Sequence, residues 1–188
     1  MKNLSLILGL LLMTNLFGQH KITTMSEYNE WAARKKTNDL LKVNFDGKSY
    51  IDSVLILLNK YRIENGSDPV ILSDNLCKVA ELQSQYCANN LILTHKQDNE
   101  DLSELYLRGL KFNERGAMGE IISQCSIDML SISAKNKTIP SSVIENFKTS
   151  SGHSYIMRDE TYTRCGISLV QSKKDPNLYY VAIVFSVN

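Results

Sequence analysis

The sequence predicts an α+β fold, with helices first along the chain and an antiparallel pair of strands last. Two observations carry this prediction. Apolar residues between positions 50 and 150 recur at spacings of three and four, which is the period of a helix that buries one face. Apolar residues in the last quarter alternate instead with polar or small ones, which is the period of a strand. Helices followed by strands favour a layered α+β domain over a parallel doubly wound sheet.

Four helices are predicted in chain order. The first has one apolar stripe and ends at residues 64–66, and the second begins after Ser73 as N-cap and ends at residues 89–90. A short helix is expected from Ser103, and a further one from Pro140 that stops before Gly152. The stripe of the first helix consists of Ile51, Val54, Leu55, Leu58 and Tyr61.

The strands are predicted at residues 165–170 and 179–187. Residues 175–177, with the sequence Asp-Pro-Asn, lie between them as a turn. The two strands are therefore expected to form an antiparallel hairpin.

Residues 1–18 have the pattern of a secretory signal peptide: a lysine, then an apolar run, then a small-residue exit. The alternative is a membrane anchor, but the apolar run is far shorter than the roughly 20 residues that span a bilayer. We therefore expect a signal peptide at 1–18, a polar arm at 19–48 and a folded domain at 49–188. The mature protein is expected to be extracellular or periplasmic, with no stable membrane span after cleavage.

The charge balance excludes one class of partner. The chain has 21 Lys and Arg against 20 Asp and Glu, for a formal net charge of +1. Such a chain lacks the excess of positive charge that binds a phosphate backbone, so nucleic acid is not an expected partner.

Four cysteines, Cys77, Cys87, Cys125 and Cys165, follow the predicted signal peptide. An even number in an exported chain favours two disulfides. Cys77 and Cys87 share one predicted helix at a separation of about 15 Å, beyond disulfide reach, so two connectivities remain. The alternative is that some of the four are buried thiols.

Three polar residues are candidates for a site. His95 and His153 fall in predicted loops at helix ends, where binding groups are commonly carried, and Glu120 begins an extended apolar run. Taken alone, residues so far apart in sequence are weak evidence for a shared site, and unrelated surface groups are the preferred interpretation.

Four segments together resemble the CAP superfamily, also called the SCP domain, of cysteine-rich secretory, antigen and pathogenesis-related proteins. They are residues 57–90 with an Asn-x-x-Arg turn at Asn59 and Arg62, residues 93–95 (Leu-Thr-His), residues 119–122 (Gly-Glu-Ile-Ile), and residues 151–153 (Ser-Gly-His) followed by 162–166 (Tyr-Thr-Arg-Cys-Gly). Their order is similar to that of the short bacterial secreted members.

The resemblance implies a three-layer α-β-α sandwich with a central antiparallel sheet. It also implies a central cleft lined by His95, Glu120 and His153, in which His95 and His153 can hold zinc or another divalent cation. Ser150 and Thr161 stand where classical members carry a second glutamate and a further histidine. Neutral imidazoles suit zinc, and two protein ligands leave coordination positions open.

The predicted function is that of a secreted CAP-type binding domain, whose cleft takes a divalent metal, a small apolar ligand or a peptide. One alternative is a metal-assisted hydrolase in which Glu120 is the general base acting on water. The other is an extracellular protein-interaction module in which the histidines only brace loops. Binding is preferred over catalysis because resemblance of fold does not establish an activity.

Overall fold

The computed structural model describes residues 47–126 and 139–187. The predicted signal peptide lies outside the described residues, as does the predicted arm up to residue 46. Residues 47 and 48, which we assigned to the arm, open the first described helix. None of the helices in the described ranges is both long and apolar enough to cross a bilayer.

A four-stranded sheet forms the middle of the domain, in the order β1-β3-β4-β2. Its strands are β1 (Ile71–Leu72), β2 (Met118–Ser126), β3 (Arg164–Gln171) and β4 (Leu178–Ser186). The predicted hairpin is confirmed as β3 and β4, which pair antiparallel, as do β4 and β2. The short β1 runs parallel to β3, so the sheet is mixed rather than purely antiparallel.

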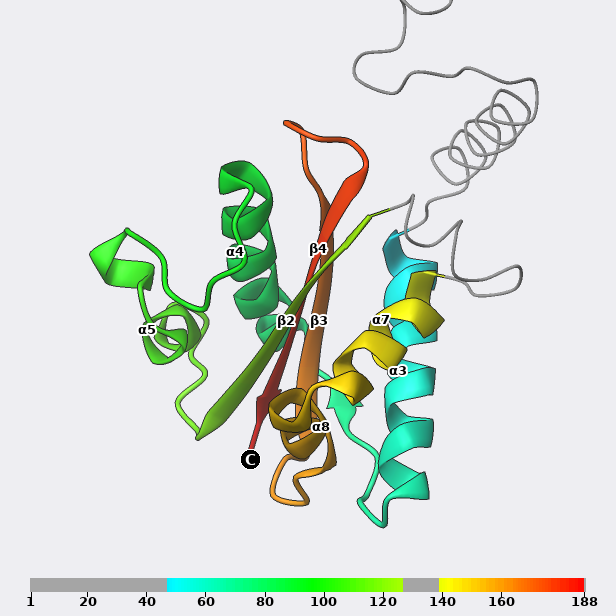
Figure 1. Cartoon of the computed structure of the whole chain (residues 1–188). Helices are drawn as coiled ribbons and strands as arrows, with labels where there is room; N and C mark the ends of the chain where they lie inside the picture. The colour runs from blue at the N-terminus through cyan, green and yellow to red at the C-terminus, as the bar shows by residue number, and fades with distance from the viewer. Residues whose placement is uncertain (1–46, 127–138, 188) are drawn as a thin grey trace, which may run out of the picture. The chain divides into compact units, whose positions relative to one another are not determined.

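Helices cover both faces of this sheet (Figure 1). One face carries α4 (Asp74–Asn90) and the short α5 (Leu105–Leu110), which follows the 3-10 turn η1 (Glu100–Leu102). The opposite face carries α3 (Gly47–Glu64), α7 (Ile139–Thr149) and α8 (Ser151–Arg158). The predicted α+β class and the three-layer α-β-α arrangement are confirmed.

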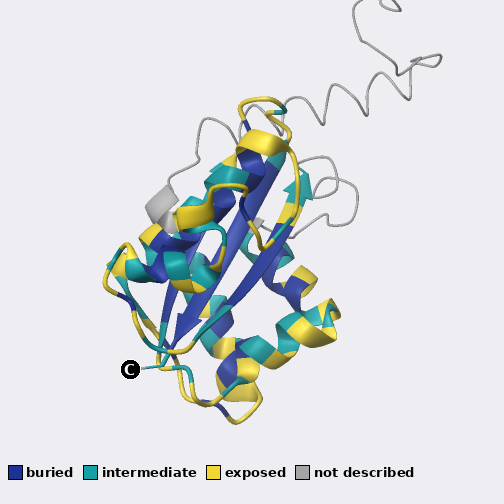
Figure 2. Cartoon of the chain, turned by 90° about the vertical axis from the view of Figure 1, so that its left-hand side faces the viewer, coloured by how far each residue is buried: buried dark blue, intermediate teal, exposed yellow. Residues whose placement is uncertain are grey.

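The core lies on both faces of the two central strands. Every residue of β4 from Tyr179 to Ser186 is buried, because α4 covers one face and the other helices cover the second (Figure 2). On the α4 side, Ala182 and Val184 pack against one apolar stripe of that helix, formed by Leu76, Val79 and Ala80. Alternation along the strand therefore fixes which residues face each helical layer.

Local sequence explains where the helices begin and end. The Ser73 hydroxyl accepts a hydrogen bond from the Leu76 N–H, which confirms the predicted N-cap of α4. Leu91 ends α4 in the left-handed region at φ 55°, and its N–H bonds to the Cys87 carbonyl. The Ser150 hydroxyl similarly caps α8 by accepting from the His153 N–H. His153 therefore lies in a helix, and the prediction that placed it in a loop is wrong.

All four cysteines are free thiols. The two disulfides expected from the sequence are therefore not formed in this structure. Cys87 packs with Ala88 and Tyr180 on the α4 face of the sheet, whereas Cys125 of β2 pairs with Tyr179, the neighbour of Tyr180 in β4. Adjacent strand residues point to opposite faces, so the sheet separates these two thiols. The buried-thiol alternative fits the structure.

Candidate functional site

The site is centred on His95 and Glu120, which lie 25 positions apart in sequence and meet directly. Nδ1 of His95 lies 2.9 Å from Oε1 of Glu120. The Glu120 side chain is 3% exposed, while that of His95 is 55% exposed. A carboxylate without a proton can only accept a hydrogen bond, so a neutral ring in this position would carry its proton on Nδ1 and keep the lone pair of Nε2. The structure thus brings together two of the three predicted site residues.

Glu120 is held from its other side by Arg108 of α5. Nη2 of Arg108 donates to Oε2 of Glu120 at 2.8 Å, and the arginine side chain is completely buried. Its Nη1 donates to three carbonyl oxygens of the preceding loop, those of His95, Leu102 and Ser103, at 3.1 to 3.3 Å. Both carboxylate oxygens of Glu120 therefore have partners, one charged and one imidazole.

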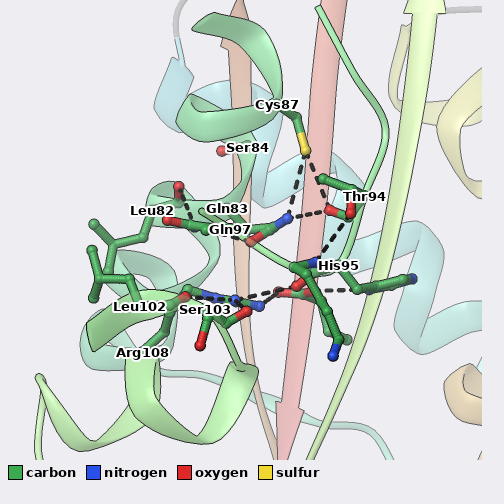
Figure 3. Close-up of polar contacts among 12 residues, drawn as sticks. Leu82, Gln83, Ser84, Cys87, Thr94, His95, Gln97, Leu102, Ser103 and Arg108 are labelled. Carbon is green, nitrogen blue, oxygen red and sulfur yellow. Dashed lines mark hydrogen bonds and ion pairs between the residues drawn. The ribbon is translucent and has the colours of Figure 1, made fainter. Parts of the chain in front are cut away.

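Two buried glutamines fix the loop that carries His95 (Figure 3). Nε2 of Gln83, on α4, donates to the Thr94 carbonyl, directly before His95. Nε2 of Gln97 donates to Oε1 of Gln83 at 3.0 Å and to the Leu82 carbonyl at 3.1 Å. The loop is thus tied to α4 by its two amides and to α5 by Arg108, which restricts where the His95 ring can go.

Gly119, which precedes Glu120, is required by close packing on the opposite face of β2. A Cβ atom on Gly119 would lie 2.6 Å from the hydroxyl oxygen of Tyr162 and 3.3 Å from a methyl carbon of Ile156. No side chain fits there unless its neighbours move. At Gly119 the absence of a side chain lets the ring of Tyr162 pack against one face of the edge strand β2. The next residue, Glu120, directs its carboxylate to the other face.

His153 approaches β2 from the layer opposite to Arg108, because α8 packs against that strand from the α3 side. Its ring contacts Phe147 edge-on, with centroids 5.2 Å apart at 87°. The pKa of His153 is lowered, first by burial and second by the nearby charge of His95. Among the described residues, no hydrogen bond joins His153 to His95 or Glu120, so the two histidines interact only through space.

These residues could hold a metal only through imidazole nitrogens. Nε2 of His95 is the free nitrogen of an exposed ring, and His153 favours its neutral form, which is the form that ligates. Within residues 47–126 and 139–187, no group of three or more His, Cys, Asp or Glu side chains is arranged to hold an ion. The arrangement offers two imidazole ligands at most. The carboxylate of Glu120 contacts the ring of His95 and would orient that ring rather than bind the metal.

An exposed apolar ridge leads into the site. Leu91, Ile92 and Leu93 are 41%, 41% and 51% exposed, in consecutive positions just before Thr94 and His95. Three large apolar side chains in a row on a surface are unusual unless they bind something. A separate hollow of about 600 Å³ lies on the outer side of α3 between Leu55 and Glu64, and contains none of the predicted site residues.

Three residues of the site, Arg108, Gln83 and Gln97, were not predicted from the sequence. Arg108 stands in the otherwise apolar segment Leu-Tyr-Leu-Arg-Gly-Leu, and an arginine in such a segment is a detectable signal for a buried charge that needs a carboxylate. The glutamines lack any comparable signal. Gln83 occupies the apolar face of its helix, where it could equally have been read as a tolerated polar residue.

Comparisons with known proteins agree with this architecture. The family model for the cysteine-rich secretory protein family, CAP, matches residues 55–185. No curated protein matches the chain significantly.

Three solved structures are similar in fold. An outer surface protein from Borrelia burgdorferi superposes with a TM-score of 0.62 at 14% identity, covering 77% of this chain and 96% of the other. An extracellular protein containing an SCP domain from Bacillus anthracis gives 0.60 at 15% identity, covering 76% of this chain and 41% of that one. A cysteine-rich secretory protein from Staphylococcus aureus gives 0.56 at 14% identity, covering 77% and 40%.

The match to the last two proteins thus spans about two fifths of their length. At these identities the superpositions establish the fold alone. The family model covers well over half of the 188 residues, and the segments that it spans include the Gly-Glu step, His95 and His153. The chain belongs to the CAP family, the cysteine-rich secretory protein family.

Proposed function

We propose that this protein is an exported CAP-domain binding protein that takes a divalent cation such as zinc on His95 and His153. The apolar ridge of Leu91, Ile92 and Leu93 would contact a small apolar or peptide ligand beside that cation. The observation that carries the proposal is the exposed imidazole of His95, fixed by a buried carboxylate.

A metal-ligating histidine typically donates its second ring N–H to a carboxylate or a carbonyl, which sets the tautomer and raises the basicity of the ligating nitrogen. His95 has this arrangement, since Nδ1 faces Glu120 at 2.9 Å and the ring is 55% exposed. When bound, the cation would supply a positive charge and open coordination positions for water or a ligand.

His153 suits the second ligand position for an electrostatic reason. Its lowered pKa keeps the imidazole neutral at neutral pH, so a cation would not have to displace a proton. The charge of His95 contributes to this shift, so the two rings are near enough for their charges to interact.

The alternative function, a metal-assisted hydrolase, requires Glu120 to act as general base, and the contacts of Glu120 argue against that role. Both oxygens of this carboxylate already accept hydrogen bonds, from Arg108 and from His95, and the side chain is 3% exposed. A general base must reach the proton that it removes, so Glu120 fits the role of orienting His95 better than that of activating water.

An extracellular location is supported by two kinds of observation. Residues 1–18 have the pattern of a signal peptide. Similar folds occur in proteins described as an outer surface protein and as an extracellular protein.

Zinc titration of the purified chain by calorimetry tests the cation site. We expect one zinc ion per chain, with binding at least tenfold weaker in His95→Ala and in His153→Ala. Lys96→Ala is the matched control, because Lys96 is next to His95 in the same loop but pairs with Glu104 at 3.0 Å. Unchanged zinc affinity in both histidine variants would refute the proposed site and leave the interaction-module alternative.

A further inference from the structure

A completely buried arginine stands behind the His95–Glu120 pair. Taking a guanidinium out of water is costly unless it meets an opposite charge and several acceptors. Arg108 meets Glu120 and three loop carbonyls, yet its Nε–H has no partner among the described residues. Since an apolar side chain could fill this space without these demands, stability alone is a weak reason for an arginine here.

Arg108 holds His95 in two ways, one through Glu120 and one by a direct hydrogen bond. Through Nη2 it fixes Oε2 of Glu120, and the rigid carboxylate then presents Oε1 to Nδ1 of His95. Through Nη1 it binds the main-chain carbonyl of His95 itself. One guanidinium therefore holds the main chain of His95 directly and the ring of His95 through Glu120.

We infer that Arg108 is a positioning residue, which acts through Glu120 to hold His95 in the Nδ1–H tautomer with the Nε2 lone pair facing outward. A planar guanidinium can bind a carboxylate and several carbonyls at once, and an ammonium group cannot reproduce this geometry. The inference deepens the proposed cation site but concerns the ring of His95 in the metal-free protein.

The test is the tautomer of His95, read from the ring ¹⁵N chemical shifts of the full chain without metal, under mildly alkaline conditions. His95→Gln identifies the resonances. The wild-type ring is expected in the Nδ1–H form. Arg108→Lys, which keeps the charge, is expected to show a mixture of both tautomers and a zinc affinity lower by about 10- to 100-fold.

Arg164→Lys is the matched control. Arg164 also binds a buried glutamate, with Nη1 and Nη2 at 3.0 and 2.9 Å from the two oxygens of Glu114, but contacts neither His95 nor Glu120. A general loss of stability would affect both lysine variants, whereas the His95 tautomer should change only in Arg108→Lys. A folded Arg108→Lys variant with the wild-type tautomer would overturn the inference.

A second measurement needs no variant. If Arg108 is held as described, its Nη groups give separate, slowly exchanging ¹⁵N resonances in the wild-type chain, because rotation of the guanidinium is blocked. One averaged Nη resonance would overturn the inference even if Arg108→Lys failed to fold. If the tautomer is as expected but zinc does not bind, the cation site fails and the role of Arg108 stands.

Discussion

Loss of the Arg62 side chain should cost considerable stability. It is completely buried in α3, and its guanidinium donates to four main-chain carbonyls at 2.7 to 3.1 Å. Asp68 follows α3, Met157 lies in the last turn of α8, and Asp159 and Tyr162 follow α8. One side chain thus joins the ends of two helices, which explains the arginine of the Asn-x-x-Arg turn.

Arg62→Leu should lower the free energy of unfolding by at least about 3 kcal/mol, because each buried carbonyl left without a donor costs about 1 to 3 kcal/mol. Urea unfolding measures this loss. Arg158→Leu is the control: Arg158 is an exposed residue of α8, and its removal should change stability by no more than about 0.5 kcal/mol. A loss below about 1 kcal/mol in Arg62→Leu would contradict the prediction.

The thiols of Cys125 and Cys165 should make the fold sensitive to alkali. Burial raises the pKa of Cys125 and that of Cys165 to about 12, from 9.0. Above about pH 9 the unfolded chain releases thiol protons that the folded chain retains, so stability falls as pH rises toward 12.

We expect the urea midpoint of the wild-type chain to fall between about pH 8 and pH 10, and to fall less in Cys125→Ala. Each protein is compared with itself at the two pH values. The stability lost to the cavity that Cys125→Ala creates is the same at both and therefore cancels. An equal fall in both proteins would show that the Cys125 thiol does not contribute.

Single residues also show how far prediction from the sequence reaches. His95 and Glu120 were predicted together because their short motifs resemble known ones, and they do meet. Arg108 was not predicted, because its burial depends on contacts with a loop and a strand that close only in three dimensions. The disulfides were predicted from cysteine count and compartment, neither of which reports on which face of the sheet a thiol lies.

At the level of elements, the close approach of α4 to β3 depends on Gly166. A Cβ atom at this position would overlap the main chain of α4 at Leu76 and Cys77. Main-chain atoms of a capped helix cannot move aside as the end of a flexible side chain can. The helix and the sheet would therefore have to separate.

Gly166→Ala should lower the free energy of unfolding by about 3 kcal/mol, at the upper end of the usual cost of overpacking. Gly152→Ala is the matched substitution, because Gly152 lies in α8 and a Cβ atom there would meet no neighbouring side chain or strand within 4 Å. That change should be neutral or stabilising by up to about 1 kcal/mol. Thermal unfolding of both variants measures the difference, and equal effects would contradict the packing argument.

Elements with a strong period were predicted well, and the short α5 was expected too, whereas β1 and α8 were not predicted. α4, β3 and β4 have clear periods, and their observed ends lie within one or two residues of the predicted ones. β1 has only two residues and is defined by its pairing with β3, so no local sequence pattern could predict it. α8 was missed because Gly152 in its first turn indicates a break, whereas the Ser150 cap allows a new helix to begin.

For the molecule as a whole, the order of the sheet determines where the fold is most protected. β4 lies between β3 and β2, and helices cover both of its faces. Every residue from Tyr179 to Ser186 is buried, so an amide there is exposed only when a neighbouring strand and a helical layer both separate. β1 is an edge strand of two residues, and Ile71 is 72% exposed.

Native-state hydrogen exchange should therefore be slowest in β4, with its central amides opening only through global unfolding. The amide of Ile71, which bonds to the Thr163 carbonyl at 3.0 Å, serves as the internal control, because it is hydrogen-bonded but lies at the edge. It should exchange with a lower opening free energy than the amides of Ala182 and Ile183. If those two exchanged as fast as Ile71, the central strand would open independently of its covering layers, contrary to a domain stabilised by packing on both faces of one sheet.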